Sequence, residues 1–106
     1  CLGDGSEYRG DYAASWAEVR AFHRTRLQVL VDTAPDVFAI ETIPTLAEAE
    51  IVVEELRALT DAPAWVSFAC ASESHTCGGD EAGDDCIIIV VLHFEVEFRL
   101  VQCDRL

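Results

Sequence analysis

The stretch VFAIETIPT, residues 37–45, decides the fold. Its first four residues are all apolar, which is typical of a short strand that is covered on both faces in a parallel sheet. Glu41 ends this apolar run, and Pro44 followed by Thr45 marks the start of a helix. The stretch therefore predicts a buried strand, a polar strand end and a helix in direct succession.

An amphipathic helix is expected before this strand. Apolar residues recur at steps of three and four positions across residues 15–34, and Ser15 with Glu18 forms a capping-box motif at the start. Pro35 ends the helix, because proline disfavours helical geometry in the residue that precedes it. His23 lies on this helix, where we expect it to be exposed to solvent.

A second helix and a second strand follow. Thr45 and Glu48 repeat the capping box, about 30 residues after the first, and an apolar stripe continues to about Thr60. Residues 65–69, WVSFA, form another apolar run that closes at Cys70. The order helix, strand, helix, strand at this spacing is the rhythm of βαβ crossovers. The sequence therefore predicts an α/β fold with parallel strands, in a doubly wound sheet or a barrel.

The last part of the chain has a different pattern. Residues 71–85 are small, polar and acidic, as expected of a loop. Residues 87–91 form a β-branched run, and apolar and polar residues then alternate through residues 93–100, which predicts an amphipathic strand. The expected organisation is an α/β segment over residues 1–81 and a β-rich tail over residues 82–106.

The composition excludes several classes of partner. The chain has 106 residues, is 51% hydrophobic, and carries a formal net charge of -13. This charge repels nucleic-acid backbones and anionic membrane surfaces, and the longest apolar run is far shorter than the roughly 20 residues of a membrane span. Five cysteines and no recognisable leader favour reduced thiols and a cytoplasmic location. Because the chain begins with Cys1, we expect it to be a piece of a longer protein.

The polar residues that follow the two strands are the candidate site. Ligands gather at the carboxyl ends of parallel strands, and Glu41 and Cys70 occupy that position on successive strands. A charged residue there either lines a pocket, as an ammonium anchor or proton carrier, or points into solvent and caps the next helix. The strand-end position favours the pocket for Glu41. For Cys70, packing is the more common role.

A metal site is a weaker interpretation. Cys70, His75, Cys77 and Cys86 are spaced in a way that matches no paired zinc motif. A thiol–metal protein that uses the three cysteines of this group nevertheless remains an alternative.

Four motifs, in their order and spacing, carry a resemblance to a known family. They are DGSEYRGDY at residues 4–12, FHxxRL at residues 22–27, IETIP at residues 40–44 followed by AEAE at residues 47–50, and PAWVSFAC at residues 63–70. Together they resemble the middle of the homocysteine S-methyltransferases. The resemblance covers residues 2–81 and implies a fragment of a (β/α)8 TIM barrel, with two to three βα units, followed by a tail that does not match.

The resemblance also implies a reaction and a binding site. In that family zinc holds the thiol of homocysteine as a thiolate, which accepts a methyl group from S-methylmethionine or S-adenosylmethionine to give methionine. Glu41 and Thr42 would bind the substrate, with Glu41 at its ammonium group. Four further residues would shape the pocket: Ser6, Glu7, Tyr8 and Cys70.

The zinc ligands of the family are one cysteine on a later strand and an adjacent cysteine pair after two glycines, and neither motif occurs in this sequence. We therefore assign no metal ligand and no catalytic residue, and expect no methyl transfer by these residues alone. The expected partners are homocysteine and a sulfonium methyl donor, with self-association through exposed strand edges. The alternative from another class is a small non-catalytic interaction module that pairs through its C-terminal edge strand.

Overall fold

The computed structural model describes residues 4–72, 74–81, 88–92 and 100–102. Its elements, in chain order, are the 3-10 helix η1 (Ser6–Tyr8), α1 (Trp16–Asp32), β1 (Phe38–Ile43), α2 (Leu46–Leu59), β2 (Ala64–Phe68), β3 (Ile88–Leu92) and β4 (Leu100–Gln102). The predicted order helix, strand, helix, strand is confirmed by α1 to β2. The α/β class is therefore confirmed as well.

The four strands form one sheet in the order β1-β2-β3-β4. β1 and β2 are parallel, with Phe38 opposite Ala64, and α2 connects them, so the predicted βαβ unit is present. β3 pairs antiparallel with β2, and β4 antiparallel with β3. The β-branched run at residues 87–91 is thus observed as a strand one residue further on, whereas the alternating segment 93–100 lies outside the described residues except at its last position.

The two helices begin differently although their start motifs match. In α1 both arms of the capping box form, because the Ser15 side chain accepts from the Glu18 N–H and the Glu18 carboxylate accepts from the Ser15 N–H. In α2 the Thr45 hydroxyl accepts from the Glu48 N–H at 3.2 Å, but the Glu48 carboxylate binds side chains of other elements. Among the described residues, no helix is both long and apolar enough to span a bilayer.

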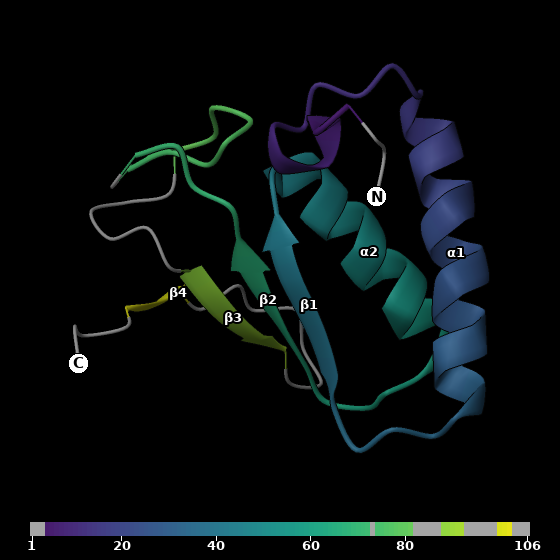
Figure 1. The fold of residues 1–106 in the computed structure, drawn as a ribbon. Coiled ribbons are helices and arrows are strands. Elements are labelled where there is room, and N and C mark those ends of the chain that lie inside the picture. The colour runs from purple at the N-terminus through teal and green to yellow at the C-terminus, as the bar shows by residue number, and fades with distance from the viewer. Residues whose placement is uncertain (1–3, 73, 82–87, 93–99, 103–106) are drawn as a thin grey trace.

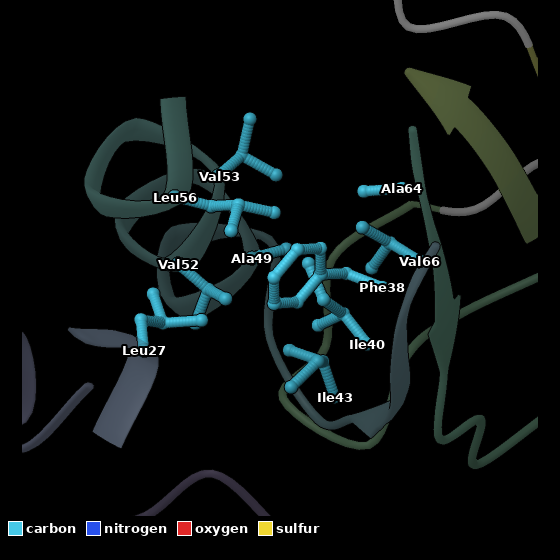
Figure 2. Packing of buried hydrophobic residues seen from close by; sticks show 10 residues of the cluster. All are labelled: Leu27, Phe38, Ile40, Ile43, Ala49, Val52, Val53, Leu56, Ala64 and Val66. Carbon is cyan, nitrogen blue, oxygen red and sulfur yellow. The ribbon is translucent and has the colours of Figure 1, made fainter. Parts of the chain in front are cut away.

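The hydrophobic core lies between α2 and the β1–β2 pair. Figure 2 shows the α2 side chains pointing toward the strands, with one residue of α1 at the border of the cluster. Leu56 and Val66 are the largest side chains that are fully buried. The cluster consists of Leu27, Phe38, Ile40, Ile43, Ala49, Val52, Val53, Leu56, Ala64 and Val66.

A buried carboxylate joins α1 to α2. Glu55 of α2 accepts from Arg20 Nη1 at 2.7 Å and from Arg24 Nε at 2.6 Å, both on α1. These guanidinium hydrogen bonds lower the pKa of Glu55 from its ordinary 4.5 to about 2. α1 therefore packs against α2, and α2 packs against the sheet, as Figure 1 shows.

In the described part of the chain, helices cover only one face of the parallel pair. Along β1, Phe38 and Ile40 are buried beneath the helix, whereas Ala39 and Glu41 are exposed, as the alternation of a strand requires. The expectation that these strands are covered on both faces is therefore wrong for the described part of the chain. The run is apolar because the residues on both faces of the strand are apolar, but the described helices pack on only one of these faces. We call the other the open face.

Candidate functional site

The carboxyl end of β1 contains a distortion at Thr42. The register with β2 shifts between Ile40 and Ile43, and Thr42 has a φ of 65°. Its N–H donates to Ser67 Oγ of β2 at 3.1 Å. A β-branched residue in this left-handed region costs roughly 1–2 kcal/mol, and such strain is concentrated at functional sites. The strain therefore marks the strand end that carries the predicted substrate-binding residues.

Glu41 lies on the open face. It alternates with Ile40, which is buried on the helix side, and its own side chain is exposed. Ser67 alternates in the same way with the buried Val66, so both polar side chains belong to the open face at the carboxyl ends of their strands. An exposed carboxylate in this position is able to accept charge-assisted hydrogen bonds from an ammonium group.

η1 lies beside the tip of β1, as Figure 1 shows, and contacts that strand. Gly5, with a φ of 77°, precedes it, and the Ser6 N–H donates to Asp4 Oδ1 at 2.9 Å. Ser6 is buried, Glu7 is half-buried and Tyr8 is exposed. The structure thus brings the three predicted pocket residues of η1 to the same end of the sheet as the β1 terminus.

The loop after β2 also returns to this end of the sheet. Asp80 Oδ2 accepts from the Leu46 N–H in the first turn of α2 at 2.8 Å and from Thr76 Oγ1 at 3.1 Å. The Gly78 N–H donates to the Pro44 carbonyl at 2.8 Å. The predicted loop is therefore tied to the start of α2, and its Asp80 satisfies one of the N–H groups that a helix start leaves unpaired.

The cysteines near the site do not form a metal centre in the described residues. Cys70 is half-buried and disulfide-bonded, so the expectation of reduced thiols is wrong for this residue. Cys77 is free, and Cys86 lies outside the described residues. In the described ranges, no group of three or more His, Cys, Asp or Glu side chains is arranged to hold a metal ion.

A polar network lies behind η1, around Glu48. This carboxylate is 6% exposed; its Oε1 lies 2.8 Å from His23 Nε2, and its Oε2 accepts from the Tyr12 hydroxyl at 2.5 Å. Burial, and next the Glu48 carboxylate, raise the pKa of Tyr12. The expectation that His23 is exposed is wrong, because it is 8% exposed and faces α2.

Sequence reasoning did not place Tyr12, His23, Glu48 and Ser67 in one region, although all four lie within the motifs that carry the family resemblance. One signal was present, since His23 lies four residues from both Val19 and Leu27 and therefore on the apolar stripe of α1. A histidine in that position is expected to be buried and to need a polar partner. The sequence did not identify Glu48 as this partner, because its motif predicts a helix cap.

Fold and site together define an α/β protein with a strained, acidic strand end on an open sheet face. The chain belongs to the homocysteine S-methyltransferase family, whose family model matches residues 1–103. The resemblance carried by the four motifs is therefore confirmed. The match also includes most of residues 82–106, where the sequence alone shows no motif of the family.

Several relatives support this assignment. Homocysteine S-methyltransferase YbgG of Bacillus subtilis is 45% identical over 105 residues, which are 99% of this chain and 33% of the relative. Homocysteine S-methyltransferase of Escherichia coli is 43% identical over 83 residues, 78% of this chain and 27% of the relative. Betaine-homocysteine S-methyltransferase of Drosophila melanogaster is 45% identical over 104 residues, 95% of this chain and 29% of the relative.

A solved structure agrees with the fold. The metallated form of the homocysteine methyltransferase MmuM from Escherichia coli superimposes with a TM-score of 0.68 at 44% identity. The superposition covers 76% of this chain and 28% of that enzyme. The chain thus spans about a third, or less, of the length of the curated relatives and solved structure that it matches.

Proposed function

We propose that the protein takes part in methyl transfer to homocysteine, and that its residues 4–81 supply part of the homocysteine-binding site. The observation that carries this proposal is the position of Glu41 on the open face, at the carboxyl end of β1. Family membership and the names of the relatives support the choice of substrate.

In this proposal Glu41 binds the ammonium group of homocysteine. Its carboxylate is exposed and so retains its acceptor positions for a cationic ligand. The Thr42 N–H, held by Ser67 Oγ, fixes the backbone on which Glu41 is presented. Ser6, Glu7 and Tyr8 lie at the same end of the sheet and would complete this side of the pocket.

The reaction itself is a displacement at a methyl carbon. The homocysteine sulfur forms a bond to that carbon while the bond to the donor breaks, and the donor leaves as a neutral molecule. The thiol first loses its proton to solvent, because the thiolate is the nucleophile. We propose a sulfonium compound as the donor. The contribution of the described residues is to bind and orient homocysteine, which is catalysis by proximity.

We further propose that the βαβ unit is part of a (β/α)8 barrel. The open face of β1 and β2 would line the barrel interior, with Glu41 at the end where such barrels bind their substrates. Zinc is the metal that the resemblance implies. The described residues do not fit a metal ion, so no step of the reaction is assigned to a metal bound by them.

The binding proposal is tested by titrating the 106-residue chain, at concentrations where sedimentation shows a monomer, with homocysteine and with 4-mercaptobutanoate, which lacks the amino group, while recording NMR shifts. We expect Glu41→Gln to weaken homocysteine binding about tenfold, because it removes a charge-assisted hydrogen bond. The analogue should bind the variant and the parent chain equally. Glu50→Gln, at an exposed position of α2, is the matched control. Equal homocysteine affinity in Glu41→Gln and the parent chain would refute the role of Glu41.

A second test concerns activity. We expect the 106-residue chain, supplied with zinc, homocysteine and S-methylmethionine, S-adenosylmethionine or betaine, to form no methionine above the uncatalysed background. The physical reason is that the described residues contain no ligand set for the metal that would hold the thiolate. Methionine that accumulates in proportion to the chain concentration would show that the expectation is wrong.

A further inference from the structure

We propose that Glu48 is the positioning residue of the candidate site: its carboxylate holds the Tyr12 hydroxyl and the His23 ring together, and thereby fixes the segment that carries η1 against the end of β1. The inference rests on the proposed function only in taking this segment as part of the homocysteine pocket. The clamp itself is defined by the contacts of Glu48, Tyr12 and His23.

The two oxygens of Glu48 join three separate parts of the chain. Oε1 contacts His23 of α1, and Oε2 accepts from Tyr12, which lies in the segment between η1 and α1. Glu48 itself lies in the first turn of α2. One buried side chain therefore connects α1, α2 and the segment before α1.

Glu18 shows what a glutamate at this helix position does when it serves only as a cap. It is the third residue of α1, as Glu48 is the third residue of α2, but it is exposed and binds back to its own N-cap, Ser15. Glu48 is 6% exposed and directs both oxygens away from its helix. Burying a carboxylate is costly unless it is hydrogen-bonded, so Glu48 holds its two partners firmly.

A second contact ties the same segment to the same helix start. Gly10, with a φ of 77°, packs so closely on Thr45 that an added Cβ would lie 2.3 Å from Thr45 Cγ2. Gly10 and Tyr12 thus both rest on the first turn of α2. This turn begins at Leu46, four residues after Thr42, so the clamp relates η1 to the strand end over a short path.

The first experiment measures amide hydrogen exchange in the 106-residue chain by NMR. The N–H groups of Arg9 and Gly10 donate to the Ser6 carbonyl and report on η1, and the Ala69 N–H, bonded to the Ile43 carbonyl, reports on the sheet. In Tyr12→Phe we expect exchange at the first two amides to accelerate about tenfold, since a hydrogen bond to a charged group is lost, with Ala69 unchanged.

The control is Thr25→Val, which also removes a side-chain hydroxyl, here an exposed one on α1 that donates to the Ala21 carbonyl of the same helix. It should leave all three exchange rates unchanged. If Tyr12→Phe also leaves the Arg9 and Gly10 rates unchanged, or accelerates Ala69 equally, the positioning role is refuted.

The second experiment separates positioning from charge. Glu48→Gln retains an oxygen acceptor for Tyr12. Its amide N–H would donate to His23 Nε2, with the ring in its other tautomer, whereas the carboxylate accepts from that nitrogen. The variant should therefore keep exchange at Arg9 and Gly10 within about twofold of the parent chain. Glu48→Leu should accelerate both about tenfold, as Tyr12→Phe does. Equal exchange in Glu48→Gln and Glu48→Leu would contradict the clamp. Should Glu48→Leu fail to fold, the Tyr12→Phe comparison decides.

Homocysteine titration of the same variants links the clamp to the pocket. We expect Tyr12→Phe to weaken binding about threefold to tenfold, through the freed segment rather than through a lost contact. If the parent chain binds no homocysteine, the proposed function fails while the exchange result still stands. If the parent chain binds and Tyr12→Phe binds equally well despite faster exchange, the clamp does not position the site.

Discussion

At the scale of single residues, the main feature of the site is the left-handed backbone of Thr42. A β-branched side chain avoids this region, yet here it follows Glu41 and is fixed by the hydrogen bond to Ser67. Ala34, with a φ of 50° directly after α1, is the other described non-glycine residue with a positive φ. It lies before Pro35 and away from the candidate site. Ala34 therefore serves as the position with which the strain at Thr42 is compared.

The strain at Thr42 predicts the effect of glycine. Thr42→Gly and Ala34→Gly should each raise the free energy of unfolding by about 0.5–1 kcal/mol, because glycine adopts the left-handed region without a Cβ clash. Chemical denaturation of the chain measures this. Homocysteine titration should then separate the two variants, with weaker binding only in Thr42→Gly. A loss of stability in Thr42→Gly would show that its backbone is not strained.

At the scale of elements, the sequence predicted what depends on neighbours along the chain. The start of α1 and the polar strand end at Glu41 followed from motifs of a few residues, and the parallel pairing of β1 with β2 from the order and spacing of the elements. Glu48 shows the limit: its motif matches that of Glu18, but its partners lie 25 and 36 positions away in the sequence. Local pattern carries no information on such contacts, and the capping box was therefore only half correct.

The contact between α1 and α2 predicts an acid limit of stability. The pKa of Glu55 is lowered from 4.5 to about 2 in the folded chain, so its stabilising contribution is present above pH 4.5 and is lost as the pH falls toward 2. Glu55→Gln should lower stability at pH 7 and flatten this part of the pH profile. Thermal unfolding between pH 2 and pH 7 measures both effects.

Glu54→Gln is the control for this prediction. Glu54 also pairs with Arg20, at 2.7 Å, but its side chain is 63% exposed, so the pair contributes little. The variant should follow the parent profile. A Glu54→Gln profile as flat as that of Glu55→Gln would place the acid limit elsewhere than in the helix contact.

At the scale of the whole molecule, the open face is the feature that sets behaviour in solution. The helices cover one side of β1 and β2, while Ala39 and the half-buried Trp65 lie on the other. β1 is also an edge strand of the described sheet, with unpaired backbone groups along its outer side. The sequence indicated two apolar strand faces, but composition alone does not say which element packs on each.

We therefore expect the 106-residue chain to self-associate through this face. Sedimentation velocity should show a weight-average mass that rises with concentration, and Ala39→Lys should suppress the rise because it places a charge on the open face. Val29→Lys, at a position of α1 that is 63% exposed, is the matched control and should associate like the parent chain. A parent chain that stays monomeric at all concentrations would contradict the expectation.

The bond from Asp80 to the Leu46 N–H has a consequence for synthesis on the ribosome. Leu46 precedes Asp80 by 34 residues, so during synthesis this amide stays hydrated until Asp80 has also left the exit tunnel. This bond to the first turn of α2 therefore cannot form until β2 and the loop after it, which carries Asp80, have emerged. A gene truncated between the codons for Leu59 and Asp80 would encode α2 without the carboxylate that accepts from its first turn.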